Sequence, residues 1–461
     1  MLIRRTIILS LLCCLLGAWQ ALAAGQNREP EAPPAVWSAH AAVRFALANN
    51  PDSKIGRQRL IAAQAAIDLE RSAMAPQVAL SSQYSQTNTP MYSFGNILNQ
   101  GEFSNSINFN DPGRTDSLNA GVQVGYRLYN GGRDRAGVEA AGAQATAFQM
   151  ELAAVHSRLA FEAVRAFYGI TQAADIIGAE KAAVEAVSAS LELARARYEA
   201  GVLLRDAVLD LEVQQSRAKE NLIQAEHSLA VARKVFLTLL GIDEGATAIA
   251  PDAGDEQQIP SAAVAAGTRF ELKNMDAMID AAQARVRQAR AGSSPVVDGY
   301  AGYLVDHGTI TGGTGDSWQA GVKLQYTLFD GHRTSAEVAR ASAQLAELQG
   351  QRRKLELAIG LEVEQATLAL QESGERLLVT EKTVAQATES ADINRARFAE
   401  GVVLSSDLIA VENRLTEAMI RRTLARTARR VAIADLRRAV GLPQFDDLVE
   451  RPEMEKSKIM Q

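Results

Sequence analysis

The sequence predicts a mainly α-helical fold with a membrane β-barrel, built as an internal duplication in which each chain gives four strands to a 12-stranded trimeric barrel. Three observations predict this class. Residues 121–133 and 195–204 return in similar form as 321–333 and 395–404, each 200 positions later. Proline-free stretches allow very long helices, and tracts of alternating polarity precede them. A repeat without insertions indicates a rod whose length must be matched, rather than an enzyme.

The N-terminus has the pattern of a secretory signal peptide, residues 1–23. Arg4 and Arg5 precede an apolar run that ends at Ala21-Leu-Ala23, a small-residue cleavage site. The alternative, a membrane anchor, is disfavoured because the run is too short to span a bilayer. Both cysteines lie inside it, so we expect an exported chain without cysteine or disulfides.

Composition excludes several classes of function. A net charge of −6 is mild and argues against a nucleic-acid partner. The five histidines are scattered and fit no metal-ligand spacing. The sequence has no phosphate loop, nucleophile elbow or zinc signature, so we expect no cofactor, no metal site and no catalysis.

Two long helices are predicted at residues 132–199 and 332–399, which are charged, rich in alanine and free of proline. At 1.5 Å per residue each reaches roughly 100 Å. Each is followed by a glycine, Gly201 or Gly401, suited to a left-handed C-terminal turn. Return helices are then expected at about 206–240 and 407–440, which gives two helical hairpins.

The resulting domain organisation has two structural repeats, residues 24–240 and 268–442. Between them we expect a linker, residues 241–267, rich in Gly, Asp and Ala with two prolines. A short, charged tail, residues 443–461, follows the second repeat.

Four strands are predicted from strict alternation of apolar with polar or small residues, as in Leu118-Asn-Ala-Gly-Val-Gln-Val-Gly-Tyr-Arg-Leu128. About ten residues of period two suit a strand with one face in lipid and the other in water. A half-buried strand of a soluble sheet is the alternative, which the signal peptide and the rod-length helices disfavour. The strands are expected at 77–86, 118–128, 296–306 and 318–328, in β-hairpins 77–129 and 296–329.

The two copies differ in length only at the hairpin loops. Residues 87–115 form a segment rich in Asn, Ser, Gly and Phe, and its counterpart is the shorter 307–316. Length varies most easily in a surface loop, so we expect these loops outside the cell and the helical tips in the periplasm. A helix, for example 53–75 in the first copy, precedes each hairpin.

Four strands cannot close a barrel, and an open edge in hydrocarbon leaves backbone groups unpaired. The chain is therefore expected to oligomerise, with eight strands as a dimer or twelve as a trimer. Twelve strands leave a passage, which favours a homotrimer. Polar side chains are expected to line the barrel lumen: Asn119, Gln123, Arg127, Gln319, Lys323 and Gln325.

Taken together, these motifs resemble the TolC family of outer-membrane efflux proteins, over nearly all of the mature chain. The resemblance is carried by two strand-to-helix joints, at Asn130 and Gly131 and at Asp330 and Gly331, and by the tips Arg197-Tyr-x-x-Gly201 and Arg397-Phe-x-x-Gly401. It implies a passive outer-membrane conduit, with a 12-stranded barrel and a long periplasmic α-helical barrel. Implied partners are outer-membrane lipid, a periplasmic adaptor (membrane fusion) protein, and an inner-membrane efflux pump or ABC exporter.

In the family, the hairpin tips dock the adaptor and close the resting channel. Motif position assigns this role to Arg197, Tyr198, Gly201, Val202, Leu204, Arg397, Phe398, Gly401, Val402 and Leu404. The simpler alternative is that these residues only build tight turns. Asp407 matches a frequent family acid six residues after the tip glycine, where three copies would form an anionic entrance ring. Asp206 is displaced by one residue from that place. Helix capping is the alternative for Asp407.

A second class of function is an exported trimeric coiled-coil stalk or adhesin with a barrel anchor. The duplicated tips argue against a stalk, which has no need for them. Within the channel class, multidrug efflux and type I protein secretion use the same outer component, and the sequence does not choose between them.

Overall fold

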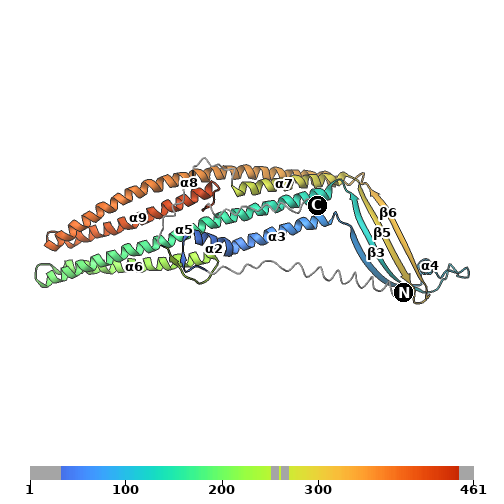
Figure 1. The fold of residues 1–461 in the computed structure, drawn as a ribbon, viewed down its shortest axis with the longest axis horizontal. Coiled ribbons are helices and arrows are strands. Elements are labelled where there is room, and N and C mark those ends of the chain that lie inside the picture. The colour runs from blue at the N-terminus through green and yellow to red at the C-terminus, as the bar shows by residue number, and fades with distance from the viewer. Residues whose placement is uncertain (1–32, 251–258, 261–268, 446–461) are drawn as a thin grey trace.

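The computed structural model describes residues 33–250, 259–260 and 269–445. The expected signal peptide and most of the expected linker and tail lie outside the described residues. Two long helical hairpins run side by side, and a four-stranded sheet continues from one end of them at an angle (Figure 1).

The rods are α5, Arg133–Glu199, and α8, Arg333–Glu400, with 67 and 68 residues. Each turns back into a return helix, α6, Arg205–Leu240, or α9, Ser405–Ala439. The return helices are about half as long, so α5 and α8 extend beyond them toward the sheet (Figure 1). At 1.5 Å per residue each rod spans about 100 Å.

Two shorter helices cover the sheet-side halves of the rods. α3, Pro51–Ser72, packs along α5, while α7, Phe270–Arg290, packs against both α5 and α8. The short η2, Ala291–Ser293, joins α7 to the sheet. Pro51 at the first position of α3 separates it from α2, Ala39–Asn49, and the Asn50 side chain caps the new helix through the Asp52 amide.

An apolar core forms at mid-length, where the chain meets the start of the linker. β1, Val36–Trp37, pairs in parallel with β4, Ala248–Ile249. Trp37 is fully buried, donates from its indole nitrogen to the Ala246 carbonyl at 2.7 Å, and meets Phe45 and Phe236 edge to face. This core fastens α2 to α5 and α6.

A partly buried ion cluster fixes the second half at the same level. Arg269, 5% exposed, donates to Glu362 at 2.8 Å, and Arg438 donates to the other oxygen of Glu362 at 2.8 Å. Burial opposes ionisation of Glu362, but these hydrogen bonds outweigh it and hold the pKa of its carboxyl below the usual value. The end of the linker is thereby tied to α8 and α9.

The sheet is antiparallel, in the order β2-β3-β5-β6. Its strands are β2, Gln77–Thr87, β3, Thr115–Tyr129, β5, Val296–His307, and β6, Thr314–Gln325. The β3–β5 pair joins the two repeats, and β2 and β6 form the two edges. Within the described chain this sheet is open.

Two expectations for the sheet need correction. β6 begins at Thr314, earlier than expected, and ends at Gln325, so residues 326–328 lie outside it. Gln325 pairs with Val296, and Pro295, the residue before Val296, has no N–H to extend the ladder. The expected loop 87–115 contains a helix, α4, Pro90–Asn99, which Pro90 begins at its first turn.

The long helices carry charged residues throughout. Among the residues that the structure describes, none of the helices is both long and apolar enough to cross a membrane.

Candidate functional site: two helical tips and a two-faced sheet

Both rods end in the same turn. Gly201 and Gly401 have φ of 76° and 85°, a conformation in which glycine carries no Cβ penalty. The Val202 and Val402 amides each donate to the carbonyl five residues back, at 3.0 Å, and each glycine amide donates three residues back. This is the Schellman arrangement, which satisfies the last helical carbonyls.

An arginine–glutamate pair, which sequence analysis missed, joins the two helices of each hairpin close to its turn. Arg395 holds Glu412 with two hydrogen bonds, of 2.5 and 2.7 Å, and Arg195 holds Glu212 with one of 2.7 Å. Both residues of each pair recur after 200 positions, and this repetition could have indicated the pairs from the sequence. The Glu412 side chain is only 7% exposed, against 40% for Glu212, and its hydrogen bonds raise the pKa of Arg395.

Arg197 links the two tips. Its guanidinium donates to the Phe398 carbonyl at 2.5 Å and to the Ala399 carbonyl at 3.4 Å, at the C-terminal end of α8. A cation at this end of a helix is favourable because the last carbonyls carry partial negative charge. Its counterpart Arg397 is exposed. The same motif residue thus has different surroundings in the two copies.

The aromatic tip residues differ in the same way. Phe398 is 2% exposed and packs in an apolar cluster with side chains from both hairpins, including Leu191, Leu211 and Leu408. Tyr198 is 44% exposed. The second hairpin therefore contributes the side chain that seals the contact between the tips.

Four apolar tip residues are uncovered in the single chain. They are 64 to 73% exposed: Val202, Leu204, Val402 and Leu404. Side chains of this kind at the end of a rod suit contact with another protein, although isolated exposed residues are common.

The two acidic candidates lie in the first turns of the return helices, and both are exposed. Asp206 accepts a hydrogen bond from the neighbouring Ala207 amide at 2.8 Å. Asp407 is not the N-cap: that position is Leu404, and α9 has no side-chain cap. The capping alternative for Asp407 is therefore wrong, and its remaining local role is a favourable charge near the helix N-terminus.

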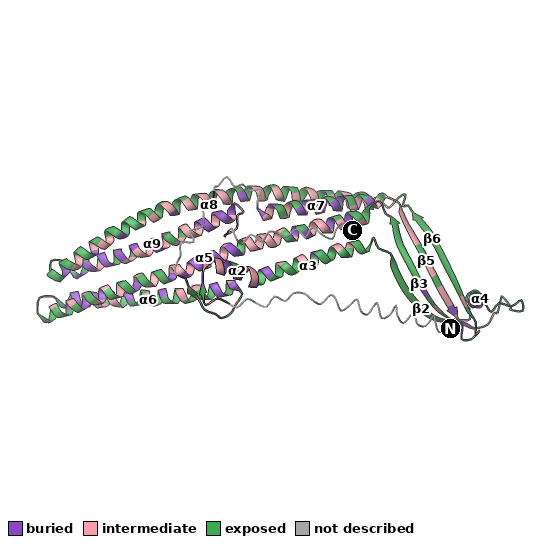
Figure 2. Ribbon diagram, in the orientation of Figure 1, coloured by how far each residue is buried: buried purple, intermediate pink, exposed green. Residues whose placement is uncertain are grey.

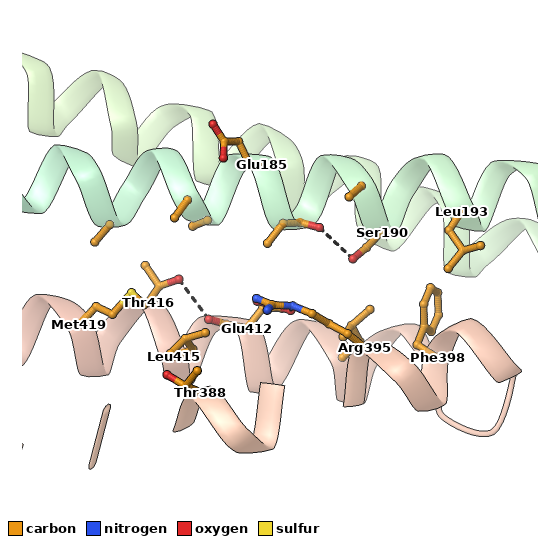
Figure 3. A pocket seen from close by; sticks show the side chains of 16 residues that line it. Glu185, Ser190, Leu193, Thr388, Arg395, Phe398, Glu412, Leu415, Thr416 and Met419 are labelled. Atoms are coloured by element: carbon orange, nitrogen blue, oxygen red, sulfur yellow. Dashed lines mark hydrogen bonds and ion pairs between the residues drawn. The ribbon is translucent and has the colours of Figure 1, made fainter. Parts of the chain in front are cut away.

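Behind the tip contact, the two hairpins separate and leave a groove of about 560 Å³. Alanines of α5 face α8 and α9 across it, with Thr388, Arg395, Glu412 and Met419 on the opposite wall (Figure 3). Gln214 bridges α6 to Asn413 of α9 at 2.6 Å. The hairpins also pack together on both sides of the groove, at the tips and at mid-length, where Ala434 of α9 joins the core formed by α5.

The strand register divides the sheet into two faces. All six expected lumen residues fall on one face, which also holds Gln83, Asp298 and Asp306. Most of the sheet is exposed in the single chain (Figure 2). The opposite face is apolar, and it holds these exposed side chains: Val78, Leu80, Tyr84, Val122, Tyr303, Trp318, Val322 and Leu324.

The polar face carries its own contacts. Arg127 pairs with Asp298 at 3.0 Å, and Lys323 stands directly opposite Asp298 in the register. Asn119 donates to Asp306 at 2.9 Å, and Gln123, Gln319 and Gln325 are exposed. Asp298 and Asp306 were missed because the alternation of β5 is weaker, with Tyr300 and Leu304 on its polar face.

The strand-to-helix joints show different local packing. Gly131 and Gly331 have φ of 69° and 66°. A Cβ on Gly131 would overlap Ser294, whereas the space around Gly331 is open. Asp330 accepts hydrogen bonds from the Thr334 hydroxyl and amide at 2.5 and 2.9 Å, which lower the pKa of its carboxyl and begin α8. Asn130 is buried, 8% exposed, and its side-chain nitrogen has no partner among the described residues.

None of these features resembles a catalytic centre or a metal site. Within the described ranges, the structure contains no cluster of three or more metal-ligating side chains. The site consists of surfaces: two apolar tips, a groove between hairpins, and a sheet with one polar and one apolar face.

Known proteins share this organisation. The chain is 27% identical over 318 residues to Protein CyaE of Bordetella pertussis, an alignment that covers 66% of this chain and 64% of that protein. It is 23% identical over 312 residues to Outer membrane efflux protein BepC of Brucella suis, covering 65% and 68%. A crystal structure of a membrane protein from Pseudomonas aeruginosa has the same fold, with a TM-score of 0.76 and 20% identity over 87% of this chain and 93% of that one.

The family model for outer membrane efflux proteins matches residues 42–241 and 263–442, which is most of the chain and both repeats. The resemblance to TolC-like proteins is therefore confirmed. The chain belongs to the outer membrane efflux protein family, and is a protein of the Gram-negative outer membrane with a large periplasmic part.

Proposed function

We propose that the chain is the passive exit duct of a tripartite efflux or type I secretion system. Three copies complete a 12-stranded barrel in the outer membrane, and their helices form a duct through the periplasm. The tips dock a periplasmic adaptor, which connects the duct to an inner-membrane efflux pump or ABC exporter.

The two-faced sheet carries this proposal. An exposed apolar face on a sheet is unfavourable in water but is what a lipid-facing surface requires. Aromatic side chains lie near both ends of the apolar face, with Tyr84 three residues from the end of β2 and Tyr126 three residues from the end of the antiparallel β3. Such rings are typical at the two interfaces of a membrane barrel.

The open edges support the oligomer. β2 and β6 each present an unpaired row of backbone groups, which lipid cannot satisfy. Pairing β6 of one copy with β2 of the next satisfies both rows and closes a ring. A ring of three copies has twelve strands and leaves a passage, which suits the exposed Gln123 and Gln319 on the polar face.

The helical part gives a second, independent support for an oligomer. α8 has a stripe of exposed apolar residues at spacings of four, seven and eleven: Leu357, Leu361, Leu368 and Val379, which are 57 to 65% exposed. Residues at these spacings lie on one side of a helix. Contact with a neighbouring copy would bury the stripe.

Two measurements test the proposal. Native mass spectrometry in detergent should give three subunits, and a folded monomer would contradict the assembly. Planar-bilayer recordings should show discrete conductance steps. A trimer that inserts in lipid without conducting would instead favour the alternative, an exported coiled-coil stalk or adhesin with a barrel anchor.

Paired cysteines test the seam directly, because the expected mature chain has none. A series of β2/β6 pairs, such as Ser82→Cys with residues of β6, should give disulfide-linked trimers for pairs in register. Ser117→Cys with the same β6 partners is the matched control, since β3 is an inner strand. Equal cross-linking of the control would contradict the seam.

A further inference from the structure

The segment that connects β2 to β3, residues 88–114, is built differently from its counterpart in the second repeat. In the second repeat, six residues, 308–313, join β5 to β6. In the first, α4 begins shortly after the end of β2 at one edge of the sheet, yet it contacts both β3 and β6, the strand at the other edge. The segment therefore crosses the end of the sheet from edge to edge (Figure 1).

Hydrogen bonds from two polar side chains fasten α4 to the sheet. Asn96 donates to the Thr115 hydroxyl at 3.0 Å, and Gln100 donates to the Asp116 carbonyl at 2.7 Å. Gln100 is 1% and Thr115 2% exposed. Satisfied polar groups in such buried positions fix one arrangement, since breaking them would leave donors unpaired.

The same contacts join the segment to the turn of the second hairpin. Gln100 also accepts a hydrogen bond from the Thr311 hydroxyl at 2.5 Å. The Asp116 carboxylate accepts from the Thr309 and Ile310 amides at 3.1 and 2.8 Å, and from the Thr309 hydroxyl. Both outer turns thus form one block.

α4 itself lies on the polar face of the sheet. Thr115 and Gly315 belong to the same face as Gln123 and Gln319 in the register. A Cβ on Gly315 would overlap the Asn99 carbonyl at the end of α4, so the helix end rests directly on that side of β6. In a barrel whose lumen is the polar face, α4 therefore projects over the lumen.

We propose that three copies of α4 form a constriction at the outer mouth of the duct, which sets the size of what passes. This inference rests on the proposed function. Twelve strands about 4.8 Å apart, tilted by about 40°, enclose a ring about 24 Å across. Three helices, each about 10 Å thick, leave at most a narrow gap within it.

The free side of α4 gives the constriction an apolar lining. Ser93 and Ile97 are buried, and Ser93 donates to the Gly113 carbonyl, whereas Met91, Tyr92 and Leu98 are 78, 69 and 49% exposed. Apolar rings in a narrow pore resist wetting and hinder ions and large polar solutes. The constriction therefore favours small or apolar solutes over bulky hydrated ones in this conformation.

Thiol labelling of a lumen cysteine tests the constriction from the outside, without any influence of the periplasmic tips. Gln123→Cys is placed on the polar face and labelled in intact cells with a small charged reagent or a polymer-linked maleimide. Val122→Cys, its neighbour on the apolar face, is the matched control. Asn110→Cys, exposed in the segment itself, reports that both reagents reach the surface.

The turn of the second hairpin provides a replacement for the segment that contains α4. Replacing residues 88–114 by the turn 308–313 keeps the terminal pairs of the two hairpins equivalent, Thr87 with Thr115 and His307 with Thr314. Gln123→Cys should react with the polymer-linked reagent at least about tenfold faster after this replacement, because the narrow opening is removed. Asn96→Ala with Gln100→Ala, which only loosens α4, should give an intermediate rate.

The outcomes separate the two proposals. Equal, fast labelling of Gln123→Cys by the large reagent with and without α4 would overturn the constriction and leave the duct intact. No labelling of Gln123→Cys in either background by either reagent, while Asn110→Cys reacts in the chain that keeps α4, would overturn the assignment of the polar face to the lumen. Labelling of Val122→Cys in place of Gln123→Cys would do the same.

Discussion

The two helical tips keep their backbone geometry and differ in their polar contacts. Both have a Schellman turn at a glycine and an arginine–glutamate pair behind it. Only the first sends an arginine across to the other tip, and only the second buries its aromatic residue and its glutamate. The mechanical requirements of a hairpin have been kept through duplication, while the contacts between and around the tips have diverged.

The divergence gives the tips unequal roles. Arg197 acts as a C-terminal cap for α8, and Phe398 fills the apolar contact between the hairpins. The second tip is therefore held both by this cap and by this apolar contact, whereas the first tip is more exposed. Variants at matched positions should not have matched effects.

The largest difference is expected between Gly401→Val and Gly201→Val. Both place a β-branched residue at positive φ, which costs roughly 1–3 kcal/mol. At Gly401 the new Cβ would also displace the Arg197 guanidinium and break its hydrogen bonds to the Phe398 and Ala399 carbonyls, whereas Gly201 has open space. Gly401→Val should therefore lower the thermal midpoint of the trimer in detergent clearly more than Gly201→Val. The corresponding alanine variants should keep the order, and equal losses would contradict the link through Arg197.

The second prediction compares the two arginine–glutamate pairs. Arg395→Ala leaves the buried Glu412 without its partner, which should cost about 2 kcal/mol or more. Arg195→Ala breaks an exposed pair and should cost less than about 1 kcal/mol. Thermal unfolding of both variants gives the comparison. Adding Glu412→Gln to Arg395→Ala should recover part of the loss, and no recovery would show that Arg395 acts through packing alone.

The sequence predicted the elements that depend on local rules. Backbone geometry explains the glycines at left-handed turns, the proline-free helices and the period-two strands. Each of these patterns occurs twice because the chain is internally duplicated. The six residues expected in the lumen share one face because a strand has a strict period of two.

The elements that depend on distant partners were not predictable. α4 lies in a segment rich in Asn, Ser and Gly, and tertiary hydrogen bonds to Thr115 and Asp116 hold it. Arg197 and Arg397 occupy the same motif, and only three-dimensional packing distinguishes them. The end of β6 is set by where its partner β5 begins.

A third prediction concerns a carboxyl inside the first hairpin. Glu180 is 6% exposed, one of its oxygens has no partner among the described residues, and burial raises its pKa above the usual 4.5. The equivalent residue of the second hairpin, Thr380, bonds to its own helix. Because the folded pKa is raised, Glu180 destabilises the fold increasingly as pH rises above about 4.5.

Glu180→Gln should therefore raise the thermal midpoint at pH 7.5, by roughly 1 kcal/mol of stability, and have little effect at pH 4. Glu180→Thr, which copies the second hairpin, should act in the same direction. The pH dependence is the decisive measurement. A shift of the midpoint that is equal at both pH values would indicate improved packing and would exclude a charge effect.

The smallest effect is expected at the acidic residues of the tips, where the copies differ by one position. If three Asp407 carboxylates ring the entrance, Asp407→Ala should lower the cation-to-anion permeability ratio a few-fold in 0.1 M salt and hardly at all in 1 M, because the Debye length falls from about 10 to 3 Å. Asp206→Ala should do less, since one residue is about 100° around a helix. Bilayer reversal potentials measure both variants. Unchanged selectivity with a lower thermal midpoint for Asp407→Ala would mean that Asp407 only stabilises the first turn of α9, through its favourable charge at the helix N-terminus.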